Sequence, residues 1–154
     1  MMVIAQEGIV FSIAWKVLQN GGGSGAKVHI DVLERFLAIV DPELVKAVLA
    51  GREFISVGCL CRLQKRKIPF AIRLRSDRRV GLSDEGRALP ARVFAQAVAL
   101  GTEEVLEDQH LFGQDGKTVK TNVVVRRIAS DEAEDPFLIL ATWNLDPTSA
   151  STLC

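Results

Sequence analysis

The chain has no surplus of charge of either sign and no long apolar run. Among its 154 residues, 19 are Lys or Arg and 19 are Asp or Glu, so the overall charge gives no indication of a partner. No segment reaches the about 18 uninterrupted apolar residues that a membrane span needs. The first eight residues, MMVIAQEG, contain no basic residue, whereas a signal peptide begins with a basic region. We therefore expect no membrane partner.

Cysteine and histidine are also scarce. Three cysteines, an odd number, do not form a disulfide framework, which favours a reducing, cytoplasmic setting. Cys59 and Cys61 form a C-x-C pair on a predicted helix, but zinc sites usually need two such pairs, or cysteine with histidine at fixed spacing. His29 and His110 are isolated in the sequence. We expect buried or half-buried free thiols at this pair.

A glycine-rich stretch, GGGSGAK at residues 21–27, does not match a phosphate-binding loop. Such a loop requires Lys directly after its last Gly, followed by Ser or Thr. Here Ala26 separates Gly25 from Lys27, and Val28 stands where Ser or Thr is required. The pattern favours a plain polar loop.

The apolar pattern predicts one α+β domain, or one with an insertion. Apolar runs at residues 1–5 and 9–18 flank the turn-like sequence QEG and predict a hairpin. Apolar residues at helical spacing predict a helix over residues 28–40, which Asp41-Pro42 ends. The other predicted elements are a buried strand (45–50), a helix (54–67), a strand (69–75), a strand near 79–80, a helix (90–100) and strands at 105–112, 119–128 and 137–143.

Basic residues gather in one part of the chain. Between residues 62 and 79 there are eight of them against one acid, Asp77. Arg73 and Arg75 alternate on a predicted strand and would share one face. Such a patch suits a nucleic acid backbone through counterion release, while a solvated surface with scattered ion pairs is the open alternative. The eight residues are Arg62, Lys65, Arg66, Lys67, Arg73, Arg75, Arg78 and Arg79.

Several segments, in this order, resemble a protein family. GIVFSIAWKVL (residues 8–18), GSGAKVHIDVLERFL (23–37), VKAVLAGREFIS (45–56) and LQKRKIPFAIRLRSDRRV (63–80) are similar to the catalytic core of bacterial insertion-sequence transposases of the DDE type. FLILATWNLDPTSA (137–150) resembles the stretch just before that family's last catalytic helix. The resemblance spans nearly the whole chain.

The resemblance implies an RNase H-like fold, in which a mixed sheet with flanking helices is interrupted by a β-rich insertion. The implied division is a partial core at residues 1–78, the insertion at 79–146 and a truncated tail at 147–154. The family's first strand and last helix would then be missing. Because that first strand is central, its absence leaves unpaired edges, so either the hairpin pairs with residues 45–50 or the product is poorly stable.

The resemblance also implies metal-dependent DNA cleavage and strand transfer. In that chemistry two Mg²⁺ ions, held by carboxylates, bracket the attacking and leaving oxygens. Family members carry Asp in V-L-A-D-R-E-F, where this chain has Gly51, and the other two acids belong to the missing strand and helix. Glu53 lies two residues further on, and one carboxylate does not hold two metals. We interpret Gly51 as the site of a lost ligand and predict no intact catalytic residue, metal or cofactor.

The resemblance therefore implies a DNA transposase fragment without cleavage activity. Its expected partner is DNA, bound weakly along the backbone through Arg52 and the eight basic residues named above. Two alternatives stay open: a non-enzymatic regulator that pairs with an intact transposase subunit, and an unrelated α+β binding module.

Overall fold

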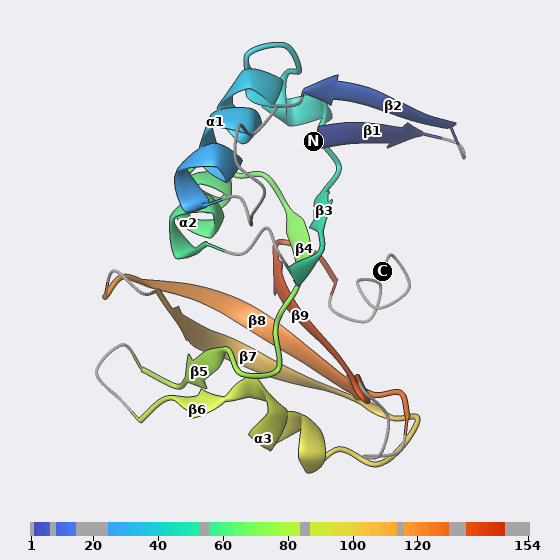
Figure 1. Cartoon of the computed structure of the whole chain (residues 1–154), viewed down its shortest axis with the longest axis vertical. Coiled ribbons are helices and arrows are strands. Elements are labelled where there is room, and N and C mark those ends of the chain that lie inside the picture. Colours follow the sequence, from blue (N-terminus) through green and yellow to red (C-terminus); the bar gives the residue numbers. More distant parts are fainter. Residues whose placement is uncertain are drawn as a thin grey trace.

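The protein is a mixed α+β molecule in a computed structural model that describes residues 2–6, 9–14, 25–52, 56–83, 87–113, 116–129 and 135–146. Figure 1 shows α1 and α2 beside β3 and β4, with the long strands β7 and β8 further along the molecule. In chain order the elements are β1 (Met2–Gln6), β2 (Ile9–Ala14), α1 (Ala26–Leu37), the 3-10 turn η1 (Pro42–Leu44), β3 (Val48–Ala50), α2 (Val57–Lys65), β4 (Phe70–Arg73), β5 (Arg79–Gly81), β6 (Leu89–Pro90), α3 (Ala91–Gln96), β7 (Glu103–Phe112), β8 (Thr118–Arg127) and β9 (Phe137–Trp143).

Seven of the strands form one sheet in the order β3-β4-β9-β8-β7-β5-β6. The β3–β4 pair is parallel and every other pair in this sheet is antiparallel. β1 and β2 form the predicted hairpin, which is a separate antiparallel sheet of two strands. The first arrangement considered from the sequence was a hairpin paired with residues 45–50. Over the described residues the hairpin does not pair with β3, so this arrangement is not present there.

The two long helices form where the apolar spacing predicts them. On α1 the residues Val32, Leu33 and Phe36 are buried, and on α2 Leu60 and Leu63 are fully buried. The Ser56 hydroxyl accepts a hydrogen bond from the Cys59 backbone N–H at 3.1 Å, which satisfies one of the free donors at the start of α2. Basic residues in the last turn of α2 suit the negative end of the helix dipole.

One hydrophobic core joins the helices to the sheet. It contains Leu33 of α1, Ala91 of α3 and a larger group from α2, β4, β5, β7, β8 and β9, so it crosses the boundary predicted near residue 78. The sheet crosses the same point, because β4 pairs with β9. Strands from both sides of residue 78 therefore share one sheet. The division into a core and an insertion remains a prediction. Fully buried members of the larger group are Leu60, Leu63, Phe70, Ile72, Val80, Leu111, Val123, Val125, Ile139 and Ala141.

Several predicted boundaries shift by a few residues. The strand expected over residues 45–50 is only Val48–Ala50, and α1 ends at Leu37, before the proline. The prediction that Arg73 and Arg75 share a strand face is wrong, because β4 ends at Arg73. The two-residue strand β6 was not predicted, since its length carries no periodic signal.

A polar hollow of about 200 Å³ lies beside the middle of β7, the first half of β8 and the carboxyl end of β9. Asp108 and Asn144 line it, and both have positive φ angles, 56° and 53°, in the left-handed region that Asp and Asn tolerate better than most residues. Thr142 also lines the hollow, and its fully buried hydroxyl has no hydrogen-bond partner among the described residues. A buried hydroxyl without a partner lowers stability.

We therefore expect Thr142→Val to raise the free energy of unfolding by about 1 kcal/mol, because it removes an unsatisfied hydroxyl and keeps the shape of the side chain. Thr121→Val is the matched control. Thr121 is equally buried, but its hydroxyl donates to the Asn122 carbonyl at 3.2 Å, so the same change should not stabilise the protein. Urea unfolding of both variants measures the difference, and equal responses would contradict this account of Thr142.

Candidate nucleic-acid interface

Two guanidinium groups meet at the carboxyl ends of β3 and β4. Because these strands are parallel, their carboxyl ends lie at the same edge of the sheet. Arg52 follows β3 after Gly51, and Arg73 is the last residue of β4. Both bind one carboxylate oxygen, Oδ2 of Asp135, at 2.9 Å from Arg52 and 2.7 Å from Arg73. Asp135 is one third exposed, at 33%, so this ion pair is partly shielded from water.

Gly51 lies in open space at this edge. A Cβ atom built on it would meet no atom within 4 Å, and its φ angle is outside the left-handed region. The backbone therefore does not require glycine here, and neither a tight turn nor a close contact explains it. Glu53, which was considered as a substitute ligand, lies outside the described residues.

The side chains gathered at this edge do not fit a magnesium site. Mg²⁺ takes oxygen ligands, usually carboxylates. The carboxylate of Asp135 accepts a hydrogen bond from Arg73 and forms an ion pair with Arg52, and both of these neighbouring side chains are cations, which do not bind a metal ion. Across the part of the chain that the structure describes, no three His, Cys, Asp or Glu side chains are grouped so as to hold a metal.

Two arginines of α2 are paired with an acid on α1. Arg66 donates to Oε2 of Glu34 at 3.1 Å. Nε of Arg62 lies 3.0 Å from Oε1 of the same carboxylate, but this oxygen accepts no hydrogen bond of good geometry, so we regard the contact as an ion pair only. These contacts join α1 to α2.

The remaining basic residues of the run differ in their surroundings. Arg75 pairs with Asp77 at 3.3 Å, and Arg79 donates to the Ala88 carbonyl at 3.3 Å. Burial lowers the pKa of Arg78, while the nearby Asp77 acts in the opposite direction. Lys65 and Lys67 are exposed, and the described structure gives neither an acidic partner.

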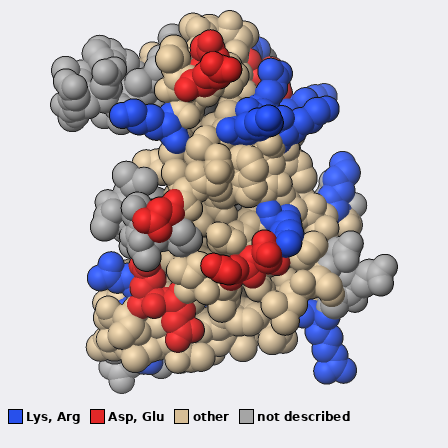
Figure 2. All heavy atoms as spheres, turned by 180° about the vertical axis from the view of Figure 1, so that it is seen from behind, with Lys and Arg blue, Asp and Glu red and all other residues tan. Residues whose placement is uncertain are grey.

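Charge on the surface is accordingly mixed. Figure 2 shows Lys and Arg side chains interleaved with Asp and Glu on the visible face. Of the nine residues predicted to bind DNA, five (Arg52, Arg62, Arg66, Arg73 and Arg75) contact an acid in the structure. Such ion pairs are what the alternative, a solvated surface with scattered ion pairs, predicted. DNA remains a predicted partner.

The acids in these pairs were not found from the sequence. Glu34 is 32 positions from Arg66, and Asp135 is 62 positions from Arg73. Neither acid lies in a recognisable motif, and a charge pattern reports only near neighbours. No signal in a single sequence identifies such distant partners.

The C-x-C pair is explained by packing, as predicted. Cys59 and Cys61 are both free, with Cys59 buried and Cys61 partly buried. Sγ of Cys61 lies 3.9 Å from the Thr118 carbonyl oxygen. Burial raises the pKa of the Cys59 thiol to about 11 from an ordinary value of 9.0. The thiol of Cys59 is therefore protonated and unreactive near neutral pH.

Comparison with known proteins gives no family for the chain. None of the protein-family models matches it, and no curated protein sequence matches it either. No helix in the described part of the chain combines the length and the apolar character needed to cross a membrane.

The raised pKa of Cys59 predicts a loss of stability at alkaline pH. The unfolded thiol ionises near pH 9, whereas the folded thiol stays protonated to about pH 11, so stability falls as pH rises between these values. At pH 10 the loss should be about 1 kcal/mol, and Cys59→Ala should remove it. Cys61→Ala is the matched control and should keep it. Denaturant unfolding at pH 8 and pH 10 measures this, and identical pH dependence in the two variants would contradict the prediction.

Proposed function

We propose that the chain is a catalytically inactive relative of the DDE insertion-sequence transposase core, with an RNase H-like origin and weak, sequence-independent binding to the DNA backbone. The observation that carries the proposal is the order hairpin, α1, β3, α2, β4, in which β3 and β4 are parallel. Three of the segments that resemble the family contain β2, α1 and β3, and a fourth contains the end of α2 and all of β4. The hairpin forms a sheet of its own.

The position of Gly51 supports the loss of cleavage activity. It follows β3 at the carboxyl edge of the parallel pair, which is where catalytic groups are usually placed in such sheets. Glycine is not required there by the backbone. Among the described residues at this edge, Arg52 and Arg73 are paired with Asp135, so the one carboxylate of this group is already neutralised.

The same three side chains support binding to phosphate. Guanidinium groups match the oxygens of a phosphate as well as those of a carboxylate. Arg52 and Arg73 converge on one oxygen of Asp135, so a phosphodiester that displaced this carboxylate would meet both. Lys65 and Lys67 add positive charge without an acidic partner in the described structure.

Asp135→Asn should strengthen DNA binding, because it frees both arginines from a competing negative charge. We expect an affinity gain of about threefold to tenfold for a 20-base-pair duplex at 50 mM salt. The slope of log K against log salt should steepen by about 0.9 for each added phosphate contact.

The matched control is Asp77→Asn, which makes the same change in charge at an acid that forms an ion pair with one arginine, Arg75, and lies near the partly buried Arg78. Its gain should be smaller. Fluorescence anisotropy over a salt series measures both variants. Equal gains would show a general charge effect, and a wild-type affinity that does not change with salt would contradict backbone binding.

Gly51→Asp should fold as the parent does, with a melting temperature within about 2 °C, because the new side chain enters open space. It should not restore cleavage, since one added acid beside two arginines does not bind two metals. A nicking assay on supercoiled DNA with Mg²⁺ measures this. Cleavage by the wild-type chain that is lost in Glu53→Gln would contradict the proposal.

A second candidate is a regulator that pairs with an intact transposase subunit. The outer edge of β3 favours it, because β3 is an end strand of its sheet and, in the part of the chain that the structure describes, pairs on one side only. Co-purification of the tagged chain with a full-length relative tests this function. A chain that remains alone in that experiment speaks against it.

A further inference from the structure

β3 presents backbone hydrogen-bonding groups that no strand uses. The Val48 N–H donates to the Pro69 carbonyl at 2.8 Å, on the side of β4. In a parallel pair alternate residues bond to the neighbouring strand, so the N–H and C=O of Leu49 point to the opposite, outer side. Over the described residues no other strand pairs with that side.

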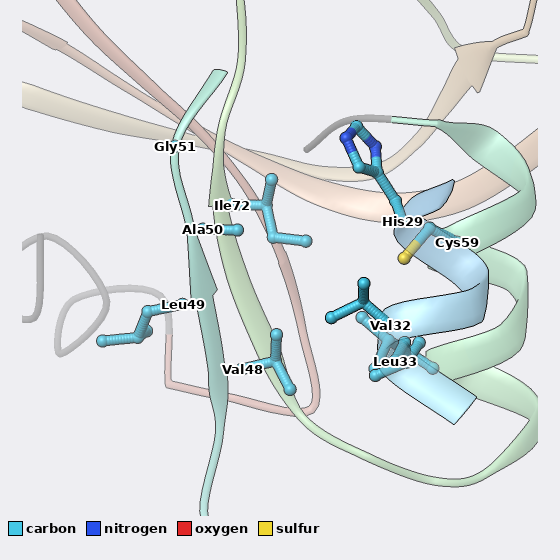
Figure 3. Close-up of a pocket in the computed structure, with 10 residues that line it drawn as sticks. His29, Val32, Leu33, Val48, Leu49, Ala50, Gly51, Cys59 and Ile72 are labelled. Carbon is cyan, nitrogen blue, oxygen red and sulfur yellow. The ribbon is translucent and has the colours of Figure 1, made fainter. Parts of the chain in front are cut away.

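An apolar pocket of about 170 Å³ lies beside the same strand. Figure 3 shows Val48, Ala50 and Ile72 on the sheet side facing Val32, Leu33 and Cys59 on the helices, with Leu49 pointing away from them. An apolar cavity of about 150 Å³ holds one benzene-sized group. The pocket therefore has room for one branched or aromatic side chain. The remaining residues that line it are His29, Gly51 and Leu63.

The helix α1 extends past this pocket to the hairpin. It contributes Val32 and Leu33 to the pocket and also contacts both β1 and β2. One helix thus packs on two sheets that are not paired with each other. An added segment at the outer edge of β3 would continue the sheet beneath α1.

We propose that the outer edge of β3 binds an extended segment of another polypeptide as an additional strand. The segment would exchange hydrogen bonds with the Leu49 backbone and place one apolar side chain in the pocket. Leu49, which is 47% exposed, would cover its opposite face. Strand addition of this kind takes affinity from the backbone and specificity from pockets for alternate side chains. The segment should therefore be an unbroken apolar run, rich in β-branched residues.

A second copy of this chain is a poorer occupant. Its own β3 offers only three strand residues, which all line its own pocket, and the side chains of Val48 and Ala50 face into it (Figure 3). Pairing of two β3 strands would leave both pockets without a large side chain. The binding of a foreign segment does not depend on DNA contact or on the proposed transposase origin.

The test uses the full chain and a fluorescein-labelled nonapeptide with five central valine and isoleucine residues, flanked on each side by threonine and lysine. Saturable binding is expected by anisotropy. Leu49→Pro removes the outward N–H, which an edge strand tolerates, and Ala50→Phe fills the pocket, so each should weaken binding about tenfold or more. Leu49→Thr keeps the backbone donor and should remain within about threefold. A nonapeptide with proline at its centre should not bind.

Hydrogen exchange on the wild-type chain gives a readout that needs no variant. When the peptide is bound, hydrogen exchange at the Leu49 amide should slow by a factor of about ten or more. Three results would each overturn the proposal. They are unchanged exchange on adding the peptide, equal binding by all variants, and a Leu49 amide that self-association already protects in the free chain. Leu49→Pro should bind duplex DNA as the wild type does, so a failure of DNA binding and a failure of strand binding are distinguishable.

Discussion

The pairing of β4 with β9 is the contact on which the rest of the structure depends. β4 joins β3 and the two helices to the remaining strands, because its other neighbour in the sheet is β9. The register places Phe70 opposite Trp143, and their rings stack with centroids 6.4 Å apart. These residues are far apart in the chain, so the pairing closes a long loop at an entropic cost that the shared core offsets. The helix α2 packs across this junction, since Gln64 at its end donates to the Lys120 carbonyl of β8 at 2.6 Å.

The same pairing decides the electrostatics at the carboxyl edge. β9 is antiparallel to β4, so the residues that precede β9 lie beside the end of β4. This brings Asp135 within 2.7 Å of Arg73. Since β3 is parallel to β4, Arg52 reaches the same carboxylate from the other side. A run that is strongly basic in sequence is thereby partly neutralised by an acid that lies 62 positions further along the chain.

β3 is one of the two end strands of the seven-stranded sheet, the other being β6, and over the described residues it has a neighbour on one side only. Short edge strands with flanking charges are a common means of preventing aggregation, and β3 has three residues followed by Gly51 and Arg52. The pocket beside it is incomplete packing between α1 and the sheet, since Ala50 is too small to fill the space below Val32 and Leu33. β3 therefore has an outer edge and a pocket beside it. A single extended segment would bind to the edge and fill the pocket.

The local pattern by itself determined the elements and the identity of much of the core. Helical spacing predicted the buried Leu60 and Leu63, the turn signals separated the hairpin strands, and apolar runs located β7, β8 and β9 to within two residues. Only the tertiary structure decided that Arg73 pairs with Asp135, that β4 stops before Arg75 and that the hairpin stays apart from β3. The physical reason is that the spacing of apolar residues indicates which face of a helix or strand is buried. The choice of partner depends on contacts between residues dozens of positions apart, which no short window of sequence contains.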